Sequence, residues 1–190
     1  MLKQLVITVL IVNLTGCAQM LAAASGSQPV GATEGQRTLS QRIEDISIEK
    51  TAAINLYKAD PQFKNAHVVF MSFHSNVLIA GQVLNAKQKQ VAEDTVRAIG
   101  EVKQIHNELS ISPQINPYLG RAKDSIISAQ ISTSLTFAKD FPSSQCKVLV
   151  EEGTVYLMGK LTRAQAEQAI GLIKNVQDIK KIIKMVDYLD

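Results

Sequence analysis

Cys17 is the residue whose type and position most directly suggest chemistry, because its thiol follows a short apolar segment near the start of the chain. The segment runs from Leu5 to Leu14 with two polar interruptions, and one cation, Lys3, precedes it. About ten apolar residues are too few to span a bilayer, which needs roughly 20, but they suit the core of a signal peptide. We therefore expect residues 1–16 to be a signal peptide that ends immediately before this thiol.

The run Leu14-Thr15-Gly16-Cys17 resembles the lipobox of bacterial lipoproteins. That resemblance implies that Cys17 is diacylated, and that the new N-terminus also receives a fatty acid such as palmitate. Ala18 follows the cysteine, whereas Asp at that position commonly marks retention in the inner membrane. The resemblance thus implies a lipid anchor in the outer membrane, with the protein facing the periplasm. An ordinary signal peptide with a chance cysteine is the alternative.

The other residue types that carry catalysis are not arranged for it. The histidines His67, His74 and His106 lie in or beside expected strands, without the spacing that gathers metal ligands. We interpret the adjacent carboxylates Glu93-Asp94 and Glu151-Glu152 as solvated charges rather than an acid/base pair across a cleft. The sequence lacks a glycine-rich phosphate loop and a nucleophile elbow. We expect no enzymatic activity, no cofactor and no metal.

Charge and cysteine content narrow the function further. The formal net charge is +3, from 20 Lys and Arg against 17 Asp and Glu, which is too balanced for a nucleic-acid partner. With Cys17 acylated, Cys146 is the remaining thiol, interpreted as buried and inert, with a redox or intermolecular-disulfide role as the alternative. One basic concentration consists of Lys174, Lys180, Lys181 and Lys184. We interpret it as a solvated helix end and strand, with contact to anionic lipid or polymer as the alternative.

The helices and strands that must position these residues are predicted to occur in the same order twice along the chain. Residues 17–38 are rich in small and polar residues and are predicted to form a flexible tether after Cys17. The first copy, residues 39–112, is predicted to contain a helix from 39 that stops at Asp60-Pro61, strands 68–73 and 77–83, a helix 86–99 and a strand 102–111. After a linker, 113–120, the second copy is predicted to contain a helix 121–139, strands 147–151 and 155–161, a helix 163–175 and a strand 179–189.

Each copy is predicted to be an α+β unit whose three-stranded sheet is covered on one face by both helices. In the first helix, the apolar residues at helical spacing are Leu39, Ile43, Ile46, Ala53, Ile54 and Tyr57. In the helix that opens the second copy, the stripe expected to face the sheet is Ile127, Ile131, Leu135 and Ala138. About 70 residues are marginal for independent stability, so we expect the two copies to pack against each other.

The repeated residues resemble the BON domain (bacterial OsmY and nodulation). Val77–Val83 aligns with Val155–Leu161, both as apolar-x-apolar-x-Gly-x-apolar, and the shared glycine predicts a bulge or a close backbone approach. An apolar pair three residues apart opens the last strand of each copy, Val102 with Ile105 and Ile179 with Ile182. The resemblance covers about residues 44–190 and implies two tandem BON domains.

With a lipobox and two such copies, the chain resembles the DolP family of outer-membrane lipoproteins. That resemblance implies a non-enzymatic protein that binds anionic phospholipid through the first helix of its second domain. It also implies a role in envelope integrity, with enrichment at division sites. The chain departs from the family in that helix: Ile126 stands at the aromatic position, and Gln130 and Ser132 stand where cations are expected.

The residues of that helix are compatible with membrane contact. Ile126 and Phe137 are eleven positions apart, about three turns, on a meridian roughly 100° from the core-facing stripe. Two large apolar groups there could insert at a membrane interface, and Arg121, Lys123 and Lys139 at the helix ends could meet phosphate. The alternative is that Ile126 and Phe137 pack against the other domain.

Two other functions compete with phospholipid binding. One is a periplasmic protein-interaction scaffold in an envelope or secretion assembly, without direct lipid recognition. The other is a soluble periplasmic stress protein, which the lipobox disfavours.

Overall fold

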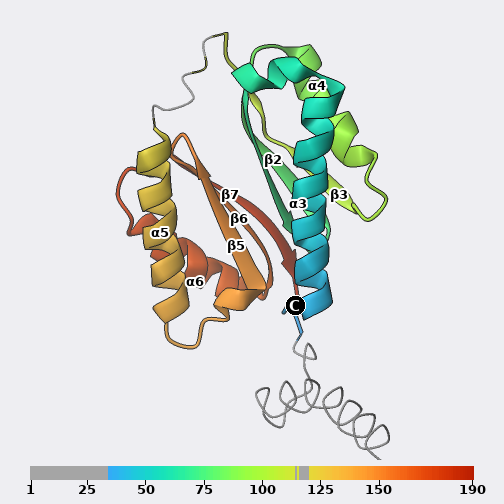
Figure 1. Ribbon diagram of the computed structural model, residues 1–190. Helices are drawn as coiled ribbons and strands as arrows, with labels where there is room; N and C mark the ends of the chain where they lie inside the picture. The colour runs from blue at the N-terminus through green and yellow to red at the C-terminus, as the bar shows by residue number, and fades with distance from the viewer. Residues whose placement is uncertain (1–33, 114, 116–119) are drawn as a thin grey trace, which may run out of the picture. The chain divides into compact units, whose positions relative to one another are not determined.

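Two α+β repeats follow one another in the computed structural model, which describes residues 34–113, 115 and 120–190 (Figure 1). The first repeat consists of α3 (Leu39–Ala59), the 3-10 helix η1 (Pro61–Asn65), β1 (His67–Phe73), β2 (Asn76–Val83), α4 (Ala86–Arg97), β3 (Gln104–Asn107) and β4 (Ser110–Ile111). The second repeat consists of α5 (Arg121–Phe137), the 3-10 helix η2 (Ser143–Gln145), β5 (Cys146–Glu151), β6 (Thr154–Leu161), α6 (Arg163–Lys174) and β7 (Lys181–Tyr188). The predicted α+β order is confirmed, whereas the predicted signal peptide, Cys17 and most of the tether lie outside the described residues.

Local sequence fixes where α3 and α6 begin. Thr38 caps α3: its side chain accepts from the N–H of Gln41, and the Gln41 side chain accepts from the N–H of Thr38. Thr162 and Gln165 form the same capping box at the start of α6. Such caps satisfy helix N–H groups that lack a partner in the helix, at a gain of about 1 kcal/mol each.

The two sheets share one topology but differ in their last strand. In the first repeat β2 pairs antiparallel with β1 and parallel with β3 and β4; in the second β6 pairs antiparallel with β5 and parallel with β7. The predicted continuous strand 102–111 is wrong, because the chain leaves the ladder between Asn107 and Ser110. There Leu109 turns into the core, where it is buried, and its N–H donates to the Asn107 side chain instead of to β2.

Both helices of each repeat cover the same face of its sheet, as expected (Figure 1). The buried core of the first repeat is Ile48, Ala52, Leu56, Phe63, Val77, Ile79, Val83, Ala92, Val96, Ile99 and Leu109. The buried core of the second is Ile127, Ile131, Leu135, Phe141, Cys146, Val150, Val155, Leu157, Leu161, Ala166, Ala169 and Ile173.

The shared glycine marks a close backbone approach in both repeats. A Cβ at Gly81, whose φ is +113°, would lie 2.1 Å from the carbonyl oxygen of His67. A Cβ at Gly159 would lie 2.6 Å from the carbonyl oxygen of Gln145. Any side chain at either position would force the first and second strands of the repeat apart, which confirms the prediction made from the pattern.

The other faces of the two sheets pack against each other, so the expected contact between the copies is present. Residues 35–190 form one compact unit. The buried side chains between the sheets are Met71, Phe73, Leu78, Ala80, Tyr156 and Met158. Burial raises the pKa of Tyr156 to about 12, with the carboxylates of Glu108, Glu151 and Glu152 adding to the shift.

The structure corrects which face of α3 meets the core. Ile48, Ala52 and Leu56 are buried against the sheet, together with the carboxylate of Asp45. The residues whose spacing predicted the helix lie on the opposite side, and all except the partly buried Ala53 are exposed. The helix carries apolar residues on both sides, and periodicity alone favoured the wrong one.

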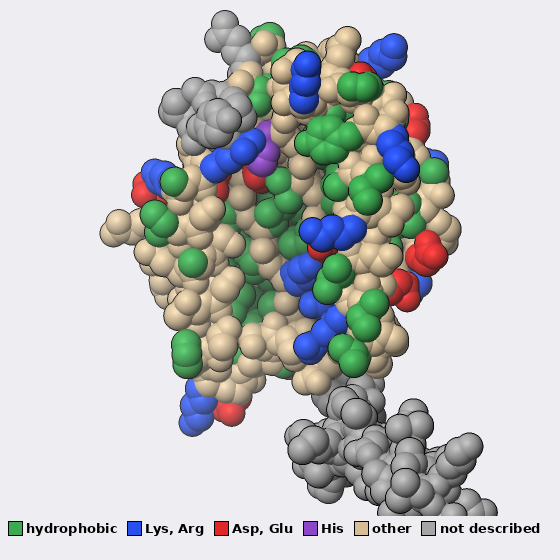
Figure 2. Space-filling model, viewed as in Figure 1, with side chains coloured by type: hydrophobic (Ala, Val, Ile, Leu, Met, Phe, Trp, Pro, Cys, Tyr) green, Lys and Arg blue, Asp and Glu red, His purple; other side chains and the backbone are tan. Residues whose placement is uncertain are grey.

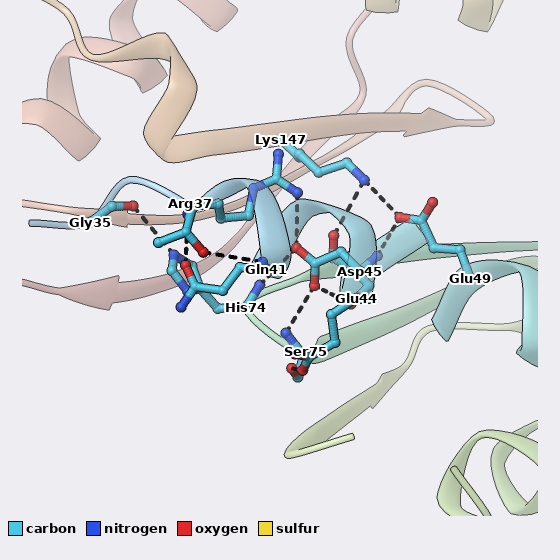
Figure 3. A network of polar contacts seen from close by, with 11 residues as sticks. Gly35, Arg37, Gln41, Glu44, Asp45, Glu49, His74, Ser75 and Lys147 are labelled. Carbon is cyan, nitrogen blue, oxygen red and sulfur yellow. Dashed lines mark hydrogen bonds and ion pairs between the residues drawn. The ribbon is translucent and has the colours of Figure 1, made fainter. Parts of the chain in front are cut away.

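Asp45 is the centre of a buried polar network (Figure 3). Its carboxylate accepts from Arg37 Nη1 at 2.9 Å, Ser72 Oγ at 2.7 Å, and the N–H groups of Ser75 and His74 at 3.0 and 3.2 Å. Burial alone would raise the pKa of Asp45, but the hydrogen bonds from Ser75, Ser72 and Arg37 outweigh burial and hold that pKa below its usual value. The network ties α3 to the β1–β2 turn.

A lysine of the second repeat extends this network across the sheets. Lys147 Nζ lies 2.7 Å from Glu49 Oε1 on α3 and donates to the carbonyl oxygen of Ser72 at 3.3 Å (Figure 3). The same Glu49 oxygen accepts from the N–H of Ser72 at 2.7 Å. Polar contacts therefore flank the apolar interface between the repeats.

Candidate membrane-docking site

The helix predicted to dock on membranes, α5, is held by its inner stripe and its first turn. Ile127, Ile131 and Leu135 are buried against the sheet, as predicted. Asp124 accepts from the backbone N–H groups of Glu152 and Gly153 at 2.9 and 3.0 Å, which ties the first turn to the β5–β6 turn. The first turn and the inner stripe of α5 are thereby fixed relative to its sheet.

Ile126 and Phe137 both project from α5 into solvent. Ile126 is 59% exposed and Phe137 is 84% exposed. The alternative that these two side chains pack against the other domain is therefore wrong within the described residues. On a regular helix they lie about 17 Å apart along one meridian. An exposed phenylalanine at a helix end is costly in water, and it is available for an apolar partner.

The three cations predicted to accompany them are in different surroundings. Lys123 Nζ forms an exposed ion pair with Asp178 Oδ1 at 3.1 Å. Lys139 lies two residues beyond Phe137 and is exposed, and its carbonyl oxygen accepts from Gln168. Arg121 is also exposed, but its guanidinium lies against the first repeat.

Arg121 belongs to a cluster that sequence reasoning missed. Its Nη2 lies 2.8 Å from Nδ1 of His67, and Nε2 of His67 lies 2.9 Å from Oε1 of Glu151. Because a guanidinium only donates, Nδ1 accepts and the proton sits on Nε2, which donates to the carboxylate. Gln82 Nε2 is 3.4 Å from the other oxygen of Glu151. The interpretation of Glu151 as a solvated charge is therefore wrong, and no local sequence pattern pairs it with a histidine 84 residues away.

The remaining candidates for chemistry in the described part of the chain are Cys146 and His74, and burial affects the pKa of each. Cys146 is buried, and burial raises the pKa of its thiol to about 11. Burial likewise lowers the pKa of His74, whose Nε2 lies 3.4 Å from the carbonyl oxygen of Gly35. Among the residues that the structure describes, His, Cys, Asp and Glu side chains do not gather in a group of three or more that could hold a metal ion. Nor is any described helix long and apolar enough to cross a membrane.

The chain matches the BON-domain family model twice, over residues 51–113 and 123–190. It is 31% identical over 180 residues to a Haemophilus influenzae protein named Outer membrane lipoprotein DolP, which covers 93% of this chain and 91% of that protein. It is 30% identical over 155 residues to the 21 kDa hemolysin of Actinobacillus pleuropneumoniae, covering 80% and 78% of the two chains. Among solved structures, the chain is similar to the C-terminal domain of CdsD, described as a structural protein of the type III secretion system of Chlamydia trachomatis. That match is 11% identical, has a TM-score of 0.32, and covers 72% of this chain and 96% of the CdsD chain. The two matches to the domain family, together with the long alignment to the lipoprotein, show that this chain belongs to the BON-domain family as a dual-BON, DolP-like protein.

Proposed function

We propose that this protein is a lipid-anchored, non-enzymatic component of the outer membrane, whose folded body binds anionic phospholipid through α5 and supports membrane integrity. The observation that carries the proposal is the exposure of Ile126 and Phe137 on one side of a helix whose other side is core. Lys139 beside Phe137 supplies positive charge at one end of this pair, and Lys123, three residues before Ile126, supplies a cation at the other end that is shared with Asp178. The outer-membrane location is supported by the name of the Haemophilus relative and by the lipobox-like run that ends at Cys17, and we propose that the body faces the periplasm.

The free energy of membrane contact through α5 can be estimated from its two exposed apolar side chains and the nearby cations. Partial insertion of one isoleucine and one phenylalanine contributes about 2 kcal/mol, and each nearby cation contributes about 1 kcal/mol at an anionic surface. These terms are small beside the binding that several acyl chains provide. The body contact would therefore orient the protein on the bilayer rather than hold it there.

Flotation of residues 18–190 on vesicles tests the proposal, because this chain lacks the lipid anchor but keeps every described residue. We expect salt-sensitive flotation on vesicles that contain anionic phospholipid, and none on zwitterionic vesicles. The double variant Ile126→Ser/Phe137→Ser should float roughly 30-fold less well, from the loss of about 2 kcal/mol. Ile111→Ser, which removes an exposed isoleucine elsewhere, is the matched control. Equal flotation of the double variant and its parent would refute docking through α5.

A second candidate, a protein-interaction scaffold, is favoured by the edge of β5. In the described chain β5 pairs only with β6, so its outer edge has backbone groups available to an added strand. A groove runs between that edge and α5, visible as a hollow in Figure 2, with Ser128, Ser132 and Lys147 in its lining. Failure of residues 18–190 to float on any vesicle, with retention of an extended peptide, would favour this function.

A further inference from the structure

The outward side of α3 carries an apolar stripe that the fold leaves uncovered. Its members, here called the outer stripe, are Leu39, Ile43, Ile46, Ile54 and Tyr57, each between 54% and 60% exposed. They lie opposite the core-facing Ile48, Ala52 and Leu56, and extend over about 27 Å of helix. No hydrophobic cluster of the described chain includes any of them. So long a row of exposed large apolar side chains is unusual on a surface without a partner.

The charges of α3 are sorted by side. All three of its acidic residues are engaged by the protein body. Asp45 is bonded to Arg37, Glu44 accepts from Ser75 Oγ at 2.6 Å, and Glu49 pairs with Lys147.

Its three basic residues, Arg42, Lys50 and Lys58, are all exposed. Within the described chain they make no ion pair and no side-chain hydrogen bond. Lys50 falls within the outer stripe, and Arg42 and Lys58 border it; Figure 2 shows hydrophobic and cationic side chains interleaved over α3. The exposed side of α3 is thus apolar and positively charged, with no carboxylate turned outward.

This combination selects the occupant. A helix that presents apolar side chains interleaved with cations suits the interface of an anionic bilayer, where the apolar groups enter the acyl boundary and the cations meet phosphate. A second copy of the chain suits it less well, because pairing two such stripes would bring Lys50 and Arg42 against like charges with no acidic residue opposite.

The position of α3 in the chain points the same way. The helix begins about 20 residues after Cys17, and the sequence predicts a flexible tether between them, which at that length would span roughly 25 Å. An anchor at Cys17 would therefore keep the start of α3 within a short distance of the lipid surface.

We propose that the outer stripe of α3, with Arg42, Lys50 and Lys58, is a second membrane-contacting face, which lies along the surface of an anionic phospholipid bilayer. This inference rests on the lipid anchor in the proposed function but not on docking through α5. It assigns the first repeat a membrane role of its own.

The test uses the full-length lipidated chain in vesicles, with an environment-sensitive fluorophore on one introduced cysteine. Cys17 is expected to be blocked by its lipid and Cys146 is buried, so Ile46→Cys, Phe137→Cys and Ala164→Cys each give one accessible thiol. Position 46 reports on the outer stripe, 137 on α5, and exposed position 164 on α6 is the control. Vesicles are phosphatidylcholine alone or an equimolar mixture with phosphatidylglycerol, each with a lipid-borne quencher.

We expect the label at 46 to be quenched severalfold more strongly than the label at 164, and only in the anionic vesicles. Each cation is worth about a fivefold gain in contact at an anionic surface. Lys50→Glu changes the charge of the outer stripe by two units. Adding this substitution should therefore lower the ratio of contacting to non-contacting protein roughly 30-fold, with unchanged thermal unfolding.

Equal quenching at 46 and 164 would overturn the inference. Quenching at 137 without quenching at 46 would leave docking through α5 intact and remove only the role of α3. Quenching at 46 without quenching at 137 would support the role of α3 and refute docking through α5. A change at 46 that depends on protein concentration and not on the quencher would identify a second copy as the occupant, which also overturns the inference.

Discussion

The buried carboxylate of Asp45 gives the sharpest prediction of stability. Asp45→Ala removes the acceptor for the Arg37 guanidinium, the Ser72 hydroxyl and two backbone N–H groups, those of His74 and Ser75. Arg37 is only 14% exposed, so water replaces the lost partner poorly. Removing one member of a buried ion pair costs about 3–5 kcal/mol, and each unsatisfied buried donor costs about 1–3 kcal/mol. Because these terms overlap, we expect a total of about 4 kcal/mol.

Urea unfolding of residues 18–190, followed by circular dichroism, measures this loss. With a slope of about 2 kcal/mol/M, the midpoint should fall by about 2 M. Asp94→Ala is the matched control, because Asp94 is exposed and accepts one bond from the exposed Gln90; its midpoint should hardly move. A loss below about 1 kcal/mol for Asp45→Ala would show that the network does not stabilise the fold.

The lowered pKa of Asp45 adds a dependence on pH. A carboxyl whose pKa is lower in the folded than in the unfolded state contributes stability above the unfolded value, about 4, and loses it as pH falls through the folded value. We therefore expect the free energy of unfolding to fall below about pH 4. Asp45→Asn should be less stable at neutral pH and should flatten this acid limb; an acid limb as steep as the parent's would contradict the assignment.

Two further predictions concern Gly159 and Cys146. Gly159→Ala should destabilise the protein by about 2–3 kcal/mol because its Cβ would meet the Gln145 carbonyl oxygen, whereas Gly171→Ala, where no atom lies within 4 Å of the new Cβ, should stabilise α6 by up to about 1 kcal/mol; equal effects on the melting temperature would refute the close approach. The buried Cys146 thiol, with its pKa of about 11, should react with a disulfide reagent at pH 8 only as fast as the protein opens. Reaction at the rate of a free thiol would refute its burial.

The element order could be predicted because strands and helices differ in period and because the order occurs twice. The inner stripe of α5 was predicted correctly, since Ile127, Ile131 and Leu135 are the only large apolar run on that side. The face of α3 was not, because both sides of that helix are apolar. One charge, Asp45, lies on the buried side, where periodicity expects none. The hydrogen bonds that Asp45 accepts from Ser72, His74 and Ser75, in the β1–β2 hairpin, explain why this side of α3 is the buried one.

The surroundings of the predicted docking residues could be anticipated only in part. The exposure of Ile126 and Phe137 follows from their offset from the core stripe, but the position of Arg121 depends on His67, which belongs to the other repeat. Such contacts arise from how two sheets pack, and local sequence carries little information on that. The broken strand around Leu109 has the same origin, since a core position drew the chain out of its ladder.

The packing of the two sheets implies that the repeats stabilise each other. Met158 is 2% exposed, on the face of β6 that meets Met71, Phe73 and Leu78 of the first repeat. Met158→Asp would place an unpaired carboxylate there, at a cost of several kcal/mol, and hydrogen exchange should then rise in β1 and β2 as well as in β6. Ile111→Asp, at an exposed site, should leave exchange in those strands unchanged. Unchanged protection of β1 in Met158→Asp would mean that each repeat is stable alone, and that the duplication is not needed for the fold.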